Sequence, residues 1–265
     1  MGESTRSKIA AFTKAACRGL SICLLLCCVL YALPRTVLAG VRWYRPRFYE
    51  NMRTRLLAEQ GQTHAEGATF TLPFGSLTLS FDAGQLTLYG SSGEPEATFD
   101  TPYHQAHLVL SGDYFYLYET GTPAFSVYSR RRLVRHVETE GAVYALCAAD
   151  TGACAVLTDD PTHASAVQVY GRSGRLTMSY QTDTPLTHLA LSSEGRTLAV
   201  TGRAVLEGAA FTETVWVDTR SQGQLARVVV PEARPLCLAF FGRHLLLVGE
   251  VHTMAMARGK ILYNY

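Results

Sequence analysis

A short strand pattern recurs along most of the chain and constrains the fold. It consists of an alternating apolar segment followed by a polar turn, as in "VQVYGRSGRL" at 167–176. Each copy is followed by one more strand and then by an apolar hairpin, such as "LSSEGRTLAV" at 191–200. Four strands in a period of about forty residues are typical of a β-propeller blade. The aligned positions are 39, 42 and 48 residues apart and are Tyr89, Tyr128, Tyr170 and Asp218.

The apolar patterning of the individual strands agrees with this interpretation. Inner strands of a propeller are covered on both faces and should be almost continuously apolar, as residues 107–119 and 236–250 are. Outer strands face water on one side and should alternate, as residues 175–183 do. A β-sandwich is the competing all-β fold, but its strands need not share a forty-residue period. We therefore predict an all-β propeller with WD-repeat-like, four-stranded blades. The expected blades are 65–101, 102–140, 141–184, 185–232 and a partial fifth from 233.

The end of the chain predicts an incomplete last blade. After the hairpin at 236–250, only "VHTMAMARGKILYNY" remains. The segment 67–74 could complete that blade, but the first blade needs it as its own strand. We therefore expect about four and a half blades in an unclosed array, with residues 254–265 poorly ordered or forming an unprotected apolar edge.

Two glycine turns are predicted in detail. Gly152 and Gly195 should adopt positive φ, because both follow polar turn residues between apolar strands. With Gly152 as a bulge, residue 149 pairs with 153 and 148 with 154. This register places Cys147 and Cys154 on opposite faces, so we expect free, buried thiols and no disulfide.

An apolar segment near the N-terminus is interpreted as a signal anchor. No charged residue occurs between Arg18 and Arg35, and extension to Val41 gives enough length to cross a bilayer. Trp43 and Tyr44 then lie where an aromatic belt is expected. A signal peptide cleaved before Gly40 is the alternative. The predicted division is a cytosolic tail at 1–18, a transmembrane anchor at 19–42, a juxtamembrane helix or linker at 43–62, and the propeller at 63–265.

Charge is distributed unevenly between these parts. Residues 1–60 carry a net charge of +7, and residues 61–265 carry −5. A basic head suits contact with anionic lipid, whereas an acidic main domain argues against nucleic acid as its partner. We predict a single-pass protein of the cell membrane, with its N-terminus in the cytosol and its propeller outside.

The repeat also suggests a family. "LALSSEGRTLAVTG" together with "VWVDTRSQGQ" resembles a WD-repeat-like blade, although Val217 separates the Trp-Asp pair of true WD repeats. Over roughly residues 15–250 the arrangement resembles an uncharacterised family of single-pass membrane proteins of Gram-positive bacteria, known as domain of unknown function 5711. The resemblance implies a membrane-anchored propeller. It implies no functional residues, because the family has no assigned activity.

Two histidine-containing clusters are candidate ligand sites. His104 and His107 have the spacing of one helical face but enter a predicted strand, so a surface pair is expected in place of a metal site. Asp159, Asp160 and His163 cluster in a loop that could hold an ion or ligand, although an Asp-Pro turn explains the same residues.

A basic cluster is a candidate for partner binding. "SRRRLVR" at 129–135 concentrates Arg130, Arg131, Arg132 and Arg135 around a turn between two strands. Such a cluster could bind an acidic partner, and a solvated turn is the alternative interpretation.

Nothing in the sequence identifies a reaction. The predicted propeller has no phosphate loop, nucleophile elbow or zinc-protease motif, and the chain has only two tryptophans, Trp43 and Trp216, where a quinoprotein-like enzyme needs many. We assign no catalytic, cofactor or metal residue. The predicted function is a non-catalytic, membrane-tethered binding or scaffold module whose partners are membrane lipid and a protein or cell-envelope component. The alternatives are a propeller enzyme, quinoprotein-like or a hydrolase, with its active site in the central channel, or a secreted propeller.

Overall fold

The computed structural model describes residues 64–206, 208–231, 234–250, 252–257 and 259–264, all within one compact unit. These residues form strands arranged in five antiparallel sheets, and they contain no helix long and apolar enough to cross a membrane. The predicted anchor and juxtamembrane segment at 19–62 lie outside the described residues.

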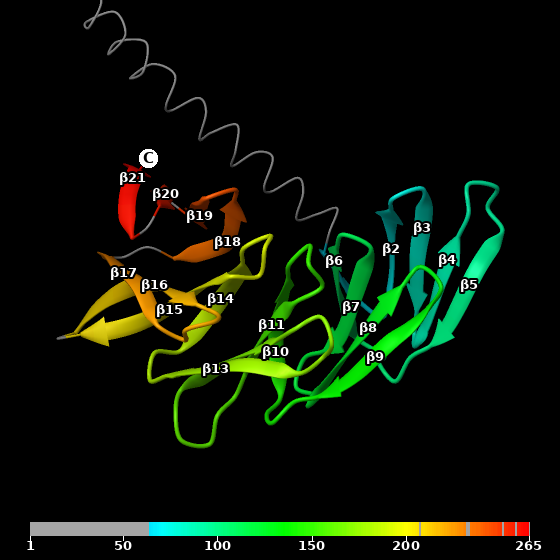
Figure 1. Cartoon of the computed structure of the whole chain (residues 1–265), viewed down its shortest axis with the longest axis horizontal. Helices are drawn as coiled ribbons and strands as arrows, with labels where there is room; N and C mark the ends of the chain where they lie inside the picture. The colour runs from blue at the N-terminus through cyan, green and yellow to red at the C-terminus, as the bar shows by residue number, and fades with distance from the viewer. Residues whose placement is uncertain (1–63, 207, 232–233, 251, 258, 265) are drawn as a thin grey trace, which may run out of the picture. The chain divides into compact units, whose positions relative to one another are not determined.

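Four consecutive strands make up each blade, in the chain order that the repeat predicts (Figure 1). The first blade contains β2 (Thr69–Phe74), β3 (Leu77–Asp82), β4 (Gln85–Tyr89) and β5 (Pro95–Asp100). The second contains β6 (Ala106–Ser111), β7 (Tyr114–Glu119), β8 (Ala124–Ser129) and β9 (Arg132–Glu138). The third contains β10 (Val143–Ala148), β11 (Cys154–Thr158), β12 (Ser165–Tyr170) and β13 (Leu176–Thr182).

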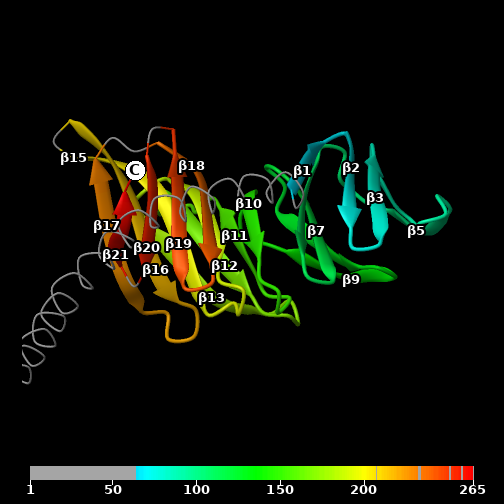
Figure 2. The same cartoon turned by 90° about the horizontal axis from the view of Figure 1, so that it is seen from above.

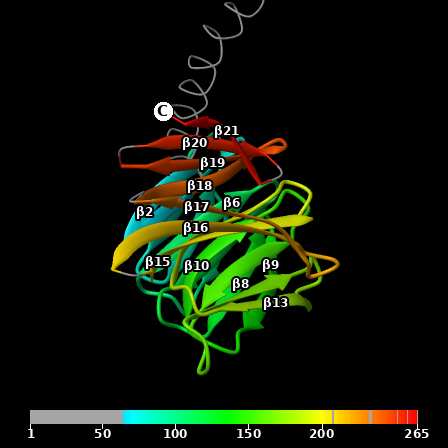
Figure 3. The ribbon, with the colours of Figure 1, turned by 90° about the vertical axis from the view of Figure 1, so that its left-hand side faces the viewer.

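The last two blades follow the same plan, side by side in Figure 3. The fourth contains β14 (Leu186–Leu191), β15 (Thr197–Leu206), β16 (Ala209–Asp218) and β17 (Gln224–Pro231). The fifth contains β18 (Pro235–Phe241), β19 (His244–Gly249), β20 (Thr253–Ala257) and β21 (Lys260–Asn264).

The prediction of a partial fifth blade was wrong. β20 and β21 extend the sheet begun by β18 and β19, so the fifth blade has four strands like the others. Met254, Ala255 and Met256 on β20 are fully buried, whereas Ile261 and Leu262 on the edge strand β21 are exposed, so the expected apolar edge is confined to β21. Short turns allow four strands in this segment, which is shorter than the forty-residue period that predicted a partial blade.

The apolar core lies between blades, because both faces of the inner strands are covered. Each pair of consecutive blades shares one cluster of buried side chains, and no such cluster joins β18–β21 to β2–β5 among the described residues. Figure 2 shows the sheets following one another in chain order. Examples of residues from neighbouring blades that share a cluster are Leu79 and Phe115, Tyr116 and Val156, Leu157 and Leu189, and Trp216 and Leu247.

One strand was not predicted. β1 (His64–Gly67) pairs antiparallel with β6, the first strand of the second blade, and makes that sheet five-stranded. The chain therefore contacts the second blade before it builds the first. The Oε2 atom of Glu66 on β1 lies 3.3 Å from Nδ1 of His107 on β6 and adds a side-chain link between these strands.

The predicted glycine turns are confirmed. Gly152 has φ of 85° and Gly195 has φ of 71°. Ala148 pairs with Cys154, and the amide of Ala149 donates to the carbonyl of Ala153, as the bulged register requires. Cys154 consequently lies in the core between the second and third blades, and Cys147 packs against the core between the third and fourth. Both thiols are free.

Candidate functional site

A groove of about 720 Å³ lies between the fourth and fifth blades. Its walls are the β14–β15 turn of the fourth blade and the β18–β19 turn of the fifth, with β16 and β17 between them. The lining residues are Ser192, Ser193, Glu194, Arg196, Thr197, Trp216, Leu225, Ala226, Phe240, Gly242 and Arg243.

Hydrogen bonds hold the wall on the fourth blade. The Ser192 hydroxyl accepts from the backbone amides of Arg196, at 3.1 Å, and Thr197, at 3.0 Å. The Thr219 hydroxyl, in the β16–β17 turn, donates to the carbonyl of Gly195 at 2.8 Å. Two turns of one blade therefore support each other, and the groove is formed before any ligand binds.

Aromatic and aliphatic side chains form the apolar part of the groove. Trp216 is only 4% exposed and belongs to the core between the fourth and fifth blades, against which Phe240 packs. Leu225, at the start of β17, is 58% exposed and adds an apolar rim. A ligand in the groove would meet a rigid floor that requires little reordering.

Two arginines provide the charge. The guanidinium of Arg196 lies 3.3 Å from the carboxylate of Glu194, and both side chains are largely exposed, so water screens this pair. Arg243 is exposed and forms no ion pair among the described residues. The groove therefore combines an apolar floor with an uncompensated positive charge.

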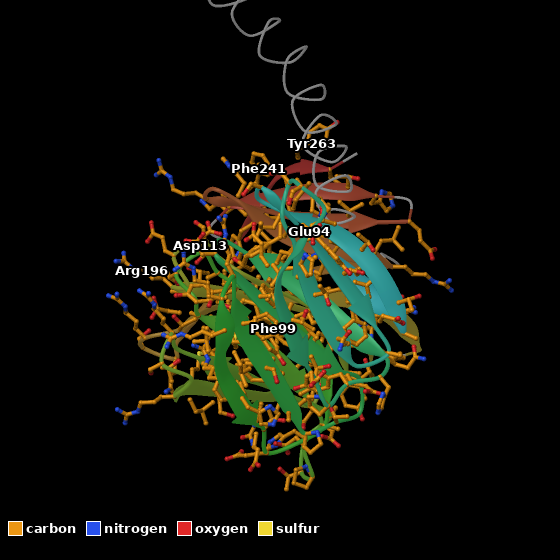
Figure 4. The ribbon with its side chains drawn as sticks, turned by 90° about the vertical axis from the view of Figure 1, so that its right-hand side faces the viewer. Glu94, Phe99, Asp113, Arg196, Phe241 and Tyr263 are labelled. Carbon is orange, nitrogen blue, oxygen red and sulfur yellow. The ribbon has the colours of Figure 1, made fainter. Side chains whose placement is uncertain are left out.

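The groove opens at one end of the blades, which we call the groove end. It is the end where the first strand of each blade turns into the second, and the third into the fourth. In Figure 4 Arg196 and Asp113, both from turns at this end, lie on the same side of the molecule. Cations outnumber acids at the groove end of the second to fifth blades. The exposed ones are Arg130, Arg131, Arg132, Arg172, Arg175, Arg196, Arg220, Arg243 and Lys260.

The histidine pair is split by the structure. His104 is exposed before β6, and its backbone amide donates to Glu119 at 2.8 Å. The His107 ring stacks on Tyr118 with centroids 4.9 Å apart, and its Nε2 lies 3.0 Å from the Thr120 hydroxyl. His107 therefore links β6 to β7 within the second blade. His104 and His107 have different partners and do not form one site.

The acidic loop is a hydrogen-bonded turn. Oδ1 of Asp160 accepts from the amides of Thr162, at 2.8 Å, and His163, at 2.9 Å, and Oδ2 accepts from Nε2 of Gln181 at 2.8 Å. The hydroxyl and amide of Thr162 are the main cause of a pKa for Asp160 well below its usual range. Because its oxygens are already used by the protein, Asp160 is a turn-forming residue. No group of acidic, histidine and cysteine side chains suited to a metal occurs in the described part of the chain.

The basic cluster separates into two roles. Arg135 reaches into the third blade, where it donates to backbone carbonyls. Arg130 lies 4.0 Å from Asp113 and over the ring of Phe74, whereas Arg131 and Arg132 are exposed.

Sequence patterns did not indicate the groove. Its residues come from four separate segments of the chain, within 192–197, at 216, at 225–226 and within 240–243, and none of them was predicted as a binding motif.

Five four-stranded, antiparallel blades that pack face to face define a protein of the β-propeller class. The chain belongs to a family of unknown function, DUF5711, whose family model matches residues 47–227. This match confirms the family resemblance found in the repeat. No curated protein sequence matches the chain.

Solved structures resemble the chain in fold alone. Hsv2 of Kluyveromyces lactis is 9% identical, with a TM-score of 0.57 over 75% of this chain and 73% of that one. Hsv2 of Kluyveromyces marxianus is 9% identical, with a TM-score of 0.55 over 73% of this chain, which spans 60% of that chain's length. The computationally designed Ika8 protein is 11% identical, with a TM-score of 0.53 over 76% of this chain and 61% of that one.

Proposed function

We propose that the protein is a non-catalytic binding module, tethered to the cell membrane through residues 19–42, whose groove between the fourth and fifth blades binds an acidic peptide segment of a partner protein. The observation that carries the proposal is the position of Trp216 and Phe240 beside Arg243 in a preformed groove. Tryptophan and arginine are enriched among the residues that dominate the affinity of protein interfaces.

The chemistry of the groove supports binding over catalysis. The Ser192 hydroxyl oxygen accepts two backbone hydrogen bonds, and no histidine or cysteine is among the lining residues to activate it as a nucleophile. Glu194 is exposed and paired with Arg196, as is usual for a carboxylate on a protein surface. A peptide carboxylate near Arg243 would instead gain a charge-assisted contact at the edge of an apolar floor.

Trp216 provides a direct test of groove binding. In the full-length chain with Trp43→Phe, Trp216 is the only tryptophan, and its fluorescence in detergent solution reports occupancy of the groove. The probe is a synthetic peptide that alternates glutamate with phenylalanine and leucine, compared with the same peptide carrying lysine for glutamate. We expect saturable quenching by the acidic peptide only, with an affinity about tenfold weaker in Arg243→Glu.

The matched control is Arg234→Glu, which changes the same charge at the other end of the fifth blade. This variant should bind the acidic peptide like the parent chain. Equal affinity of Arg243→Glu and Arg234→Glu, or equal binding of the lysine peptide, would reject the groove as an acidic-peptide site.

The tether is tested separately. Its basis is the uncharged stretch between Arg18 and Arg35 and its apolar continuation to Val41. We expect the full-length protein to stay in the membrane fraction through carbonate extraction. Release of intact protein, or a mature N-terminus at Gly40, would favour a cleaved signal peptide instead.

A further inference from the structure

The outer turn of each blade, between its third and fourth strands, carries a repeated charge. In the second to fifth blades arginine or lysine lies in this turn or at the first position of the strand that follows it, whereas the first blade has Glu94 in the turn and Glu96 on β5. All of them lie at the groove end. The cations are Arg130, Arg131 and Arg132, Arg172 and Arg175, Arg220, and Lys260.

An exposed aliphatic side chain accompanies each of these turns. It is the first or second residue of the outermost strand in the same four blades. Isolated exposed leucines are ordinary on protein surfaces. An exposed aliphatic residue near the start of the outermost strand in four successive blades is instead a repeated feature. The residues are Leu133 at 47%, Leu176 at 45%, Leu225 at 58% and Ile261 at 45% exposure. We call this set, with the cations above, the cationic rim.

Acids at the groove end neutralise the rim only in part: Asp113 lies 4.0 Å from Arg130, and both side chains are largely exposed. The Asp218 carboxylate accepts from the amides of Arg220 and Ser221 in its own turn, and Glu194 pairs with Arg196. The same end holds Asp150, which accepts a hydrogen bond from Ser111. By contrast, Arg131, Arg132, Arg175 and Lys260 have no ion-pair partner within the described residues.

The other end of the blades has the opposite charge. Of the cations at that end within the described residues, Arg203 and Arg234 are the exposed ones. The acids there lie in the first, second, third and fifth blades and in the connections between blades. They are Asp82, Asp100, Glu119, Glu138, Glu140, Asp159, Asp160, Asp183 and Glu250.

We propose that the cationic rim lies against an anionic lipid bilayer and orients the blades on it. Arginine and lysine would contact lipid phosphates, and one aliphatic side chain per blade would enter the interface. The acidic opposite end would be repelled and would face away from the bilayer. This inference rests on the proposed tether, which keeps the blades near a membrane, and it does not depend on what the groove binds.

Brominated lipid quenching tests the contact. The full-length chain with Trp43→Phe is reconstituted into vesicles of phosphatidylcholine containing brominated acyl chains, with or without phosphatidylglycerol. Leu176→Trp places a reporter on the rim. Val205→Trp places one at the opposite end, at an equally aliphatic strand position that is 73% exposed. The buried Trp216 is common to both and serves as the background.

With phosphatidylglycerol present, we expect quenching of the 176 reporter to be at least threefold stronger than that of the 205 reporter, and to fall in high salt. Combining Arg131→Glu, Arg132→Glu and Arg175→Glu should abolish the difference, whereas Arg203→Glu should not. Equal quenching of the two reporters, or quenching that does not depend on phosphatidylglycerol, would overturn the proposal and favour an acidic protein as the partner of the rim.

The failures of the tether, the groove and the rim are distinguishable. Loss of the protein from vesicles in carbonate would reject the tether alone. Flotation of the released protein with anionic but not neutral vesicles would then still support contact between the rim and lipid. The triple glutamate variant should still bind the acidic peptide through the groove, because Arg243 is unchanged. Loss of peptide binding in a well-folded triple variant would mean that rim and groove are one site, and would overturn the separate lipid contact.

Discussion

Nη2 of Arg135 donates a hydrogen bond of 3.1 Å to the backbone carbonyl of Gly152, in the β10–β11 turn of the next blade. Nη1 of the same side chain donates to the carbonyl of Arg172 in the β12–β13 turn. One residue on the outermost strand of the second blade therefore joins two turns of the third. The planar guanidinium suits this role, because its donors are held in a fixed fork.

Arg135→Ala should lower the free energy of unfolding by about 2 kcal/mol, because it leaves two backbone carbonyls without their charged donor. Arg135→Lys should recover only part of this loss. Urea unfolding of the purified chain measures both values. Arg131→Ala, in the β8–β9 turn and with no ion-pair partner among the described residues, is the control and should change stability by less than about 0.5 kcal/mol. Equal effects at both positions would contradict the role of Arg135.

Gly195→Val should destabilise the protein by roughly 1–3 kcal/mol through backbone strain at positive φ. A side chain here would also approach Cβ of Ala153 in the third blade to 3.2 Å. The neighbouring Glu194→Ala removes only an exposed ion pair and serves as the control. The melting temperatures of the two variants test whether Gly195 is required. Similar values would mean that the turn tolerates a side chain.

Burial lowers the pKa of His188, on the first strand of the fourth blade, and a hydrogen bond with the Leu236 backbone opposes this shift. The unfolded chain, with a histidine pKa of about 6.5, therefore binds the proton more tightly than the folded one. The stability that neutral His188 contributes is present above that pKa and is lost as pH falls through the lower, folded value.

His188→Gln should consequently flatten the decline in stability between about pH 7 and pH 5. Denaturant midpoints measured across this range test it. A slope that is the same in His188→Gln and in wild type would show that this histidine does not titrate with unfolding.

Burial raises the pKa of Cys154 to about 12 and also raises that of Cys147. Thiolates are the reactive form, so neither residue should be alkylated by iodoacetamide in the folded chain at neutral pH. Peptide mass mapping should find both modified only in denaturant, while an engineered Ser173→Cys in the exposed β12–β13 turn should react at once. A peptide disulfide between 147 and 154 after mild oxidation would contradict their placement on opposite faces.

The repeat made the blades predictable because strand alternation and turn residues are local properties of the sequence. Gly152 and Gly195 mark turns whose geometry depends on a few neighbouring residues, which is why the pairing of Ala148 with Cys154 could be derived in advance. The length of the fifth blade was misjudged, since the period was treated as a minimum and the short β20–β21 turn was not considered.

The groove and β1 depend on long-range contacts. Trp216 and Phe240 belong to different blades, and nothing in either segment indicates that they border one space. Likewise, "HAEG" at 64–67 is too short and polar to be read as a strand, and it becomes one because the free edge of β6 provides hydrogen-bonding partners.

The pairing of β1 with β6 has a mechanical consequence. Tension applied to the chain at His64 and at a point beyond the second blade would be transmitted directly from β1 to β6 through the hydrogen bonds between them. The first blade, built from the 69–100 segment that connects these two strands, would carry no load until that ladder broke. β1 therefore acts as a force bypass, which single-molecule pulling would register as a rupture of the β1–β6 ladder that precedes extension of the first blade.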